Sequence, residues 1–212
     1  MKVAFLHVEE KIEPARSIAL KMIESVKKNI PDAWLIQMTN MDTPILDGVS
    51  ESRRLEVTNP FFMCYRMKHL AMLNEEALIL DTDILVREDP SVVFEMPFDV
   101  ALTIRDKHII SSGMGYTKND PRMLYNTGVM FTRKTKFWQD ALDECWKLEE
   151  RHKHWFGDQV SVCKVVDSRK YDVAVLKCDR WNYTPTNSDE DLSGRSIIHY
   201  KGKTKKEWML AA

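Results

Sequence analysis

Residues 77–86 have the sequence ALILDTDILV, a short apolar run that stops at two aspartates. A continuous apolar run of this length is typical of a parallel strand that is buried on both faces. In open α/β sheets ligands bind outside the carboxyl ends of the strands, and Asp81 and Asp83 follow such an end. Because the two residues are two apart in extended backbone, their carboxylates are expected on the same side. The segment therefore predicts an α/β fold with a polar site at the end of a buried strand.

Apolar runs and helical stripes alternate on either side of this segment. We predict further strands at residues 3–8, 33–38, 98–103, 128–132, 171–176 and 196–199, and helices at residues 14–28, 137–150 and 158–166. Another helix is expected to begin at Thr58-Asn59-Pro60, a capping side chain followed by proline, and to end near Asn74. This alternation indicates one domain over residues 1–212, with a mostly parallel sheet and helices on both faces.

The composition is that of an ordinary globular protein, with 44% hydrophobic and 30% charged residues, which excludes disordered and fibrous classes. A formal net charge of -1 argues against duplex binding, which needs a basic surplus, so nucleic acid is not expected as a partner. The scattered cysteines form no CxxC pair, the apolar start is too short for a signal peptide, and no apolar stretch could span a membrane. We therefore expect a cytoplasmic protein without a transmembrane segment.

The two aspartates have two interpretations. Paired carboxylates are hard oxygen ligands that suit Mg²⁺ or Mn²⁺, and such a metal can neutralise a diphosphate as it leaves a sugar. Alternatively they only cap and solvate the strand end, and so short a pattern does not decide between the two. The chain lacks the glycine-rich loops that bind phosphate in other folds, because Gly113-Met114-Gly115 is followed by the wrong residues. A bound nucleotide diphosphate would therefore need a metal, with Asp81 and Asp83 as its chelators.

Five short motifs follow one another along the chain. They are Tyr65-Arg66 with residues 77–86, Tyr125-Asn126-Thr127-Gly128-Val129, Gly157-Asp158-Gln159-Val160, Trp181-Asn182-Tyr183, and His199-Tyr200-Lys201-Gly202-Lys203-Thr204-Lys205. In this order they resemble the donor-site core of glycosyltransferase family 8 and its GT-A relatives. The resemblance implies a Rossmann-like GT-A fold. It also implies a retaining, metal-dependent enzyme that transfers a sugar from a nucleotide diphosphate sugar, such as a UDP-sugar, to an acceptor hydroxyl.

The resemblance further implies roles for the matching residues. Asp83 and His199 would ligate the metal, usually manganese, with magnesium as a second possibility, and Asp81 would join them or hold the ribose. The mixed carboxylate and imidazole set suits Mn²⁺ better than Mg²⁺. The expected catalytic residues are Asp158, which would hold sugar hydroxyls, and Gln159, which would lie beneath the anomeric carbon.

Other matching residues would contact the donor without touching the reacting carbon. Arg66 would reach phosphate or sugar, and Asn126 would hold sugar hydroxyls. The remaining expected donor contacts are the diphosphate residues Gly202 and Lys205, the base-pocket residues His7, Val8 and Glu9, and Thr82 between the two aspartates. The four lysines of residues 201–206 are otherwise expected to form a mostly solvated tail.

The motifs depart from the family at two places. Lys206-Glu207-Trp208 stands where the family usually has Pro-Trp, and Val160 replaces an aspartate. These departures leave open a nucleotide-sugar-binding module without turnover. A sugar-phosphate nucleotidylyltransferase is a further alternative, although its glycine- and arginine-rich loop is absent after Val8. An inverting enzyme would need a base, and Asp158 or Asp106 would be the candidates. The acceptor is expected to be a soluble glycan or a protein hydroxyl.

Two pairs of side chains on predicted helices test the packing. His152 and His154 are expected at the solvated surface, because their i, i+2 spacing points them apart. Trp138 and Trp146 are expected in the core rather than on a sugar platform.

Overall fold

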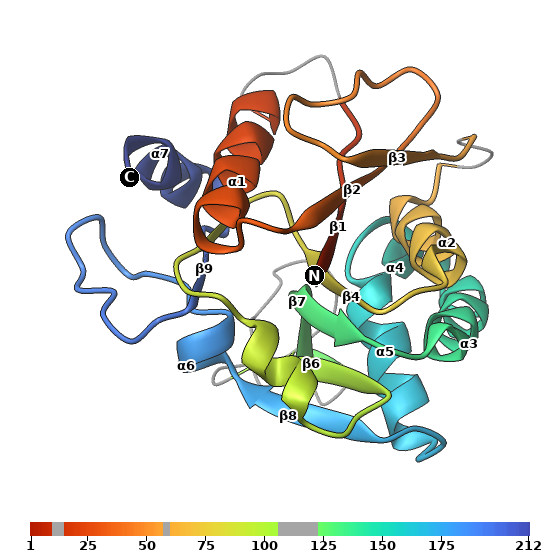
Figure 1. Ribbon diagram of the computed structural model, residues 1–212. Coiled ribbons are helices and arrows are strands. Elements are labelled where there is room, and N and C mark those ends of the chain that lie inside the picture. The colour runs from red at the N-terminus through yellow and green to blue at the C-terminus, as the bar shows by residue number, and fades with distance from the viewer. Residues whose placement is uncertain (10–14, 57–59, 106–122) are drawn as a thin grey trace.

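A computed structural model describes residues 1–9, 15–56, 60–105 and 123–212 of the chain (Figure 1). The strands are β1 (Lys2–Leu6), β2 (Trp34–Thr39), β3 (Glu51–Arg54), β4 (Ala77–Leu80), β5 (Ile84–Val86), β6 (Val100–Ile104), β7 (Tyr125–Thr132), β8 (Val173–Lys177) and β9 (Ile197–His199). The α-helices are α1 (Ala15–Asn29), α2 (Phe62–Leu73), α3 (Thr135–Trp146), α4 (Glu150–His154), α5 (Gly157–Asp167), α6 (Cys178–Trp181) and α7 (Lys203–Ala211), and a 3-10 helix, η1, spans Ser91–Glu95.

The central sheet has seven strands in the order β3-β2-β1-β4-β7-β6-β8, and β5 pairs with β9 in a separate two-stranded ladder. Strand β7 runs antiparallel to β4 and β6, whereas the other neighbours in the large sheet are parallel. The predicted mostly parallel α/β sheet is confirmed. The chain leaves β1 toward β2 on one side and later adds β4 on the other, so a topological switch point lies between β1 and β4.

Alternate side chains of the sheet pack into two separate apolar layers. Val3 and Phe5 of β1 join α1 and Met209 of α7 in one layer. Ala4 faces the opposite layer, which α2, α3 and α5 cover. Figure 1 shows these helices on the two sides of the sheet, as the strand-helix alternation predicts. Among the described residues, no helix is both long and apolar enough to cross a membrane.

The element boundaries differ from the predictions where polar residues form regular structure. Strand β3 was missed because its sequence, ESRR, is half-exposed and carries no apolar signal. Helix α2 begins at Phe62, after an N-cap residue, Phe61, whose side chain makes no capping hydrogen bond. The expected cap at Thr58-Asn59 and the expected helix start at Pro14 lie outside the described residues. The helix does end at Asn74, which adopts a left-handed conformation.

The expected helix at residues 137–150 is two helices, α3 and α4, and the break changes the packing of its side chains. Trp138 is buried as predicted, but Trp146, the last residue of α3, is 42% exposed, so its core placement was wrong. His154 is exposed as expected, whereas His152 is buried, because α4 packs against α2 and α5. The expected solvated tail is instead helix α7, which buries Met209 in the core.

Candidate metal centre

The short strands β5 and β9 bring the first and the last of the five motifs together. Asp81 follows β4, and its backbone N–H donates to the carbonyl of Gly128 at 2.8 Å. Asp83 precedes β5, whose first residue, Ile84, pairs with His199 of β9 in the antiparallel ladder. The backbone N–H of Tyr200 donates to the carbonyl of Asp83 at 2.8 Å. The β5-β9 ladder therefore brings a histidine close to two carboxylates that lie more than 110 residues earlier in the chain.

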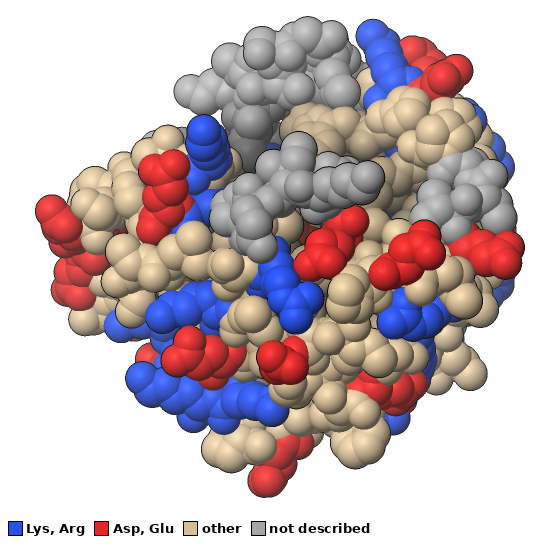
Figure 2. Space-filling view, turned by 90° about the horizontal axis from the view of Figure 1, so that it is seen from above, with Lys and Arg blue, Asp and Glu red and all other residues tan. Residues whose placement is uncertain are grey.

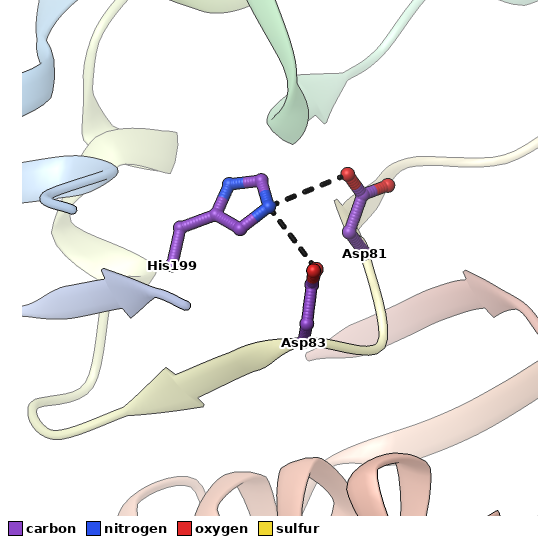
Figure 3. A group of neighbouring side chains, drawn as sticks. All are labelled: Asp81, Asp83 and His199. Atoms are coloured by element: carbon purple, nitrogen blue, oxygen red, sulfur yellow. Dashed lines mark ion pairs between the residues drawn. The ribbon is translucent and has the colours of Figure 1, made fainter. Parts of the chain in front are cut away.

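Asp81, Asp83 and His199 converge on one point beside the switch point of the sheet (Figure 3). Each can offer one ligand atom, and these atoms all lie within 4.8 Å of one another. His199 Nε2 lies 3.1 Å from Asp83 Oδ1 and 3.7 Å from Asp81 Oδ2. The imidazole is buried, and the two aspartates are partly exposed. A cation reaching this point would meet two oxygens and one nitrogen, a set that suits Mn²⁺.

A chain of hydrogen bonds fixes which nitrogen of His199 faces the carboxylates. The Asn182 amide nitrogen donates to Thr103 Oγ1 and to Asn126 Oδ1, each at 2.7 Å. This leaves Asn182 Oδ1 as the acceptor facing His199 Nδ1 at 2.8 Å. Nδ1 is therefore the donor, and Nε2 directs its lone pair at Asp81 and Asp83. Metal-binding histidines commonly have their second nitrogen fixed in this way.

The charges around the cluster favour a metal over a proton. Burial lowers the pKa of His199, and the Lys201 charge lowers it further, against the pull of Asp83. Burial opposes ionisation of Asp83, but the His199 ring and the Lys206 ammonium lower the pKa of this carboxyl overall. His199 Nε2 and Asp83 Oδ1, both able to act as metal ligands, face each other at 3.1 Å. Such an arrangement is relieved by a cation between them, so the residues present fit a divalent metal.

Because Gly128 has no side chain, the His199 ring can pack directly against its backbone. A Cβ atom at Gly128 would overlap the imidazole at Cε1 and Nδ1. The pairing of β6 with β7 shifts register between Leu102 and Thr103, so Thr103 lies opposite Asn126 and the residues after Asn126 bulge toward the site. The Asn126 side chain is buried, and its Oδ1 accepts from the Gly128 N–H at 2.9 Å as well as from Asn182. Asn126 Oδ1 therefore supports His199 indirectly, because it holds the Asn182 amide whose oxygen faces the His199 ring.

The Arg66 side chain is buried and makes ion pairs with two of the expected site carboxylates, Asp81 and Asp158. Its Nη2 donates to Asp81 Oδ1 at 2.7 Å and to the Thr127 carbonyl at 2.7 Å. Its Nη1 donates to Asp158 Oδ2 and, at 3.1 Å, to Thr127 Oγ1. Burial disfavours the charge, but Asp81 and Asp158 together raise the pKa of Arg66. Arg66 was expected to reach the phosphate or sugar of the donor. In the structure its guanidinium instead contacts the carboxylates of Asp81 and Asp158.

The expected catalytic residues begin helix α5 and are both buried. Asp158 Oδ2 accepts from Arg66 and from Thr127 Oγ1 at 2.6 Å, while Oδ1 accepts from the Gln159 backbone N–H at 2.9 Å. Gln159 Oε1 accepts from Arg105, which follows β6. Val160, the departure from the family, packs with Met123 in a small apolar cluster. Asp158 is thus joined to the metal cluster through Arg66 and Asp81.

The expected base-pocket residues lie at the carboxyl end of β1, next to β4 in the sheet. His7 is buried, and its backbone N–H donates to the Met38 carbonyl at 3.0 Å. Val8 and Glu9 are partly exposed, and the Glu9 N–H donates to Thr43 Oγ1 at 2.9 Å. Thr82 is partly exposed between the two aspartates. Asp106 and Gly113-Met114-Gly115 lie outside the described residues.

The carboxyl-terminal lysines take different positions from those expected. Gly202 precedes the first turn of α7 with a positive φ of 87°, which favours glycine. Lys205 is partly exposed on that helix. Lys206 lies with its Nζ 3.3 Å from Asp83 Oδ2, a contact that the motifs did not predict, and the expected contact of Lys205 with a diphosphate stays a prediction.

Among the described residues, sequence reasoning missed four that position or contact the metal ligands and Asp158. They are Thr103, Thr127 and Asn182, which position the expected residues, and Lys206, which pairs with Asp83. Thr127 and Asn182 stand inside two of the motifs, so their positions could have suggested a supporting role. No sequence signal marks Thr103 or separates Lys206 from its neighbours, because their contacts depend on strand register and helix phase.

Comparison with solved structures agrees with this architecture. The galactosyltransferase LgtC, solved in complex with donor and acceptor sugar analogs, is 14% identical, with 95% of this chain and 87% of that chain covered at a TM-score of 0.58. A glycosyltransferase involved in the glycosylation of the major capsid of PBCV-1 is 15% identical over 100% of both chains, with a TM-score of 0.63. GlyE of Streptococcus pneumoniae TIGR4 is 17% identical over 99% of this chain and 60% of its own, with a TM-score of 0.61.

No protein-family model and no curated protein sequence matches the chain. At 14–17% identity the structural likeness shows the fold, and the expected GT-A-type glycosyltransferase fold is confirmed. The narrower assignment to glycosyltransferase family 8 stays a prediction.

Proposed function

We propose that this protein is a metal-dependent glycosyltransferase that takes a sugar from a nucleotide diphosphate sugar, with UDP as the expected nucleotide. The observation that carries the proposal is the convergence of Asp81, Asp83 and His199 at the switch point of a GT-A-type sheet. Ligands of open α/β folds bind at this place, and two carboxylates with one imidazole can hold Mn²⁺, with Mg²⁺ as the second possibility. LgtC, whose fold this chain shares, was solved with donor and acceptor sugar analogs.

The metal, when bound, would supply positive charge to the diphosphate that departs from the sugar. The chain's own residues prepare for this by directing one imidazole nitrogen and the carboxylate oxygens of Asp81 and Asp83 toward the same point. Asn182 holds the His199 ring, and Arg66 holds Asp81. Lys206, beside Asp83, adds a cation close to where the diphosphate would lie. Gly202 and Lys205 are proposed to meet the diphosphate from α7.

The surroundings of Asp158 support retention of anomeric configuration. An inverting reaction needs a carboxylate that is free to take the acceptor proton. Both oxygens of Asp158 already accept hydrogen bonds, from Arg66, Thr127 and Gln159, so neither oxygen is free to take the acceptor proton. In the retaining route the anomeric carbon–oxygen bond to the diphosphate breaks, the acceptor oxygen bonds to the same face, and the acceptor proton passes to the departing phosphate oxygen. Asp158 and Gln159 are then proposed to hold the sugar.

A soluble glycan or a protein hydroxyl is the proposed acceptor. Figure 2 shows acidic and basic side chains interspersed over the described part of the face in view, a distribution that does not favour a polyanion there. The acceptor KM should therefore change little between low and physiological salt. A steep linear fall of apparent affinity on a log-log plot would instead indicate a nucleic acid or an anionic membrane. The cysteines Cys64, Cys145, Cys163 and Cys178 are buried and form no disulfide with one another, which supports a reducing, cytoplasmic setting.

A thermal-shift screen of nucleotide sugars, with Mn²⁺ and with EDTA, tests the proposal. A donor at 100 times its Kd should raise the free energy of unfolding by about 2.7 kcal/mol in Mn²⁺ and not in EDTA. Asp83→Asn and His199→Ala should remove the shift, whereas Asp191→Asn, an exposed carboxylate change, should keep it. Release of a nucleoside diphosphate in the presence of acceptor would establish transfer. Metal-dependent binding without release would support the alternative of a binding module, and equal binding in EDTA would refute the metal site.

A further inference from the structure

Arg105 is a buried cation at the same edge of the sheet as the metal cluster. It follows the last residue of β6, and its backbone N–H donates to the Leu124 carbonyl at 3.0 Å. Its exposed fraction is only 8%. None of the sequence motifs includes it.

The guanidinium of Arg105 is poorly satisfied. Its Nη2 donates to Gln159 Oε1, but Nε and Nη1 are buried and have no hydrogen-bond partner among the residues that the structure describes. Within the described ranges, no carboxylate forms an ion pair with it, and burial lowers the pKa of Arg105. A buried charge whose partner is a neutral amide is less stable than one that is paired with a carboxylate. Such a cost at the edge of a functional site indicates a role other than stability.

The contact determines which way round the Gln159 carboxamide lies. The two ends of a carboxamide have nearly the same shape, but a guanidinium has only donors. Turning the amide over would place its N–H groups against the N–H groups of Arg105. The neighbouring main chain is also held, because the Gln159 N–H donates to Asp158 Oδ1. The Gln159 oxygen is therefore committed to Arg105, and its amide nitrogen is free to face another group.

We propose that Arg105 is a positioning residue for sugar transfer, which holds the oxygen of Gln159 so that this side chain presents its N–H groups, and not an oxygen lone pair, to the donor sugar. The inference rests on the proposed function, because it requires Gln159 to face the sugar. In this arrangement Gln159 donates a hydrogen bond to a sugar oxygen. It does not supply the electron pair that attacks the anomeric carbon, which is consistent with direct attack by the acceptor on the retained face.

A kinetic double-mutant cycle tests whether Arg105 acts through Gln159. Arg105→Met should lower kcat about ten- to hundredfold with a nearly unchanged donor KM, because misplacing a positioned group has effects of this size. The double variant Arg105→Met/Gln159→Ala should be no slower than Gln159→Ala alone. Losses that multiply, or a normal kcat in Arg105→Met, would overturn the proposal. If Arg105→Met does not fold, Arg105→Lys keeps one donor for the oxygen and should recover part of kcat, and no recovery would count against the contact.

A measurement of Tm tests the contact between Arg105 and Gln159 without any substrate. Gln159→Glu would give the buried guanidinium an anionic partner, so it should raise Tm in the natural background. The same change should lower Tm in the Arg105→Met background, where the buried carboxylate has no cation to pair with, and equal effects in the natural and Arg105→Met backgrounds would overturn the pairing. Mn²⁺ binding by calorimetry should be unchanged in all variants. Absence of sugar transfer in the natural protein would refute the proposed function, whereas the Tm comparison would still decide whether Arg105 orients residue 159.

Discussion

Replacing Lys206 by methionine should strengthen metal binding and weaken nucleotide binding. In the metal-free protein the Lys206 ammonium lies 3.3 Å from Asp83 Oδ2, while the other oxygen of Asp83 faces His199. A divalent metal that binds Asp83 must displace this ammonium or accept its repulsion. Lys206→Met removes the competitor and keeps a side chain of similar length. Lys205→Met is the matched control for the metal titration alone, because Lys205 is also partly exposed on α7 and, among the described residues, makes no ion pair to the cluster.

The expected gain follows from the strength of the ion pair. Coulomb's law in water gives about 1.3 kcal/mol for unit charges 3.3 Å apart. The Lys206 side chain is 37% exposed, and ordering two flexible side chains lowers the net value to about 0.5–1 kcal/mol. Removing a competitor of this strength should raise Mn²⁺ affinity about two- to fivefold. The gain should shrink at high salt, because exposed ion pairs are screened.

Calorimetric titration of each variant with Mn²⁺ alone, and then with UDP at saturating Mn²⁺, measures both effects. If the displaced ammonium moves to the diphosphate, UDP affinity should fall in Lys206→Met by a factor similar to the gain in metal affinity. Opposite signs for metal and nucleotide are the signature of a lysine shared between the two. Unchanged or weaker Mn²⁺ binding in Lys206→Met, or an equal gain in Lys205→Met, would show that the ammonium does not compete for the site.

Three further substitutions test the structure around the cluster. Gly128→Ala should abolish measurable Mn²⁺ binding by calorimetry, because the new methyl group overlaps the His199 ring; normal binding would contradict the close approach. Arg66→Met should cost about 3–5 kcal/mol in urea unfolding, since it leaves Asp158, 2% exposed, without its cation; the added change Asp158→Asn should restore much of the loss. His69→Leu should make the free energy of unfolding less dependent on pH between pH 7 and pH 5. Burial, with Lys68, lowers the pKa of His69 from 6.5 to about 4, so the unfolded chain binds the extra proton first as pH falls. The natural protein should therefore lose about 2 kcal/mol more than the variant between pH 7 and pH 5 in urea titrations, and parallel pH curves would refute this assignment.

The apolar periodicity of the sequence predicted the sheet, its helices and the position of Asp81 and Asp83. Residues 77–80 are apolar throughout because β4 is buried on both faces, and such a strand in an open sheet ends where ligands bind. The distant His199 was expected in the same site only because the ordered motifs resemble a family. Periodicity alone has no information on a contact between residues 83 and 199, which depends on the antiparallel pairing of β5 with β9.

Tertiary structure decided what each polar group does within that site. Arg66, expected on the donor, lies between Asp81 and Asp158, because burial makes an unpaired guanidinium costly and two carboxylates lie within its reach. Lys206 makes an ion pair to Asp83 that no motif predicted, since this contact depends on the phase of α7 relative to the cluster. Composition and periodicity thus determined the layers and the edge that holds the site. Hydrogen-bond geometry, which depends on register, bulges and helix phase over long sequence separations, determined the partners.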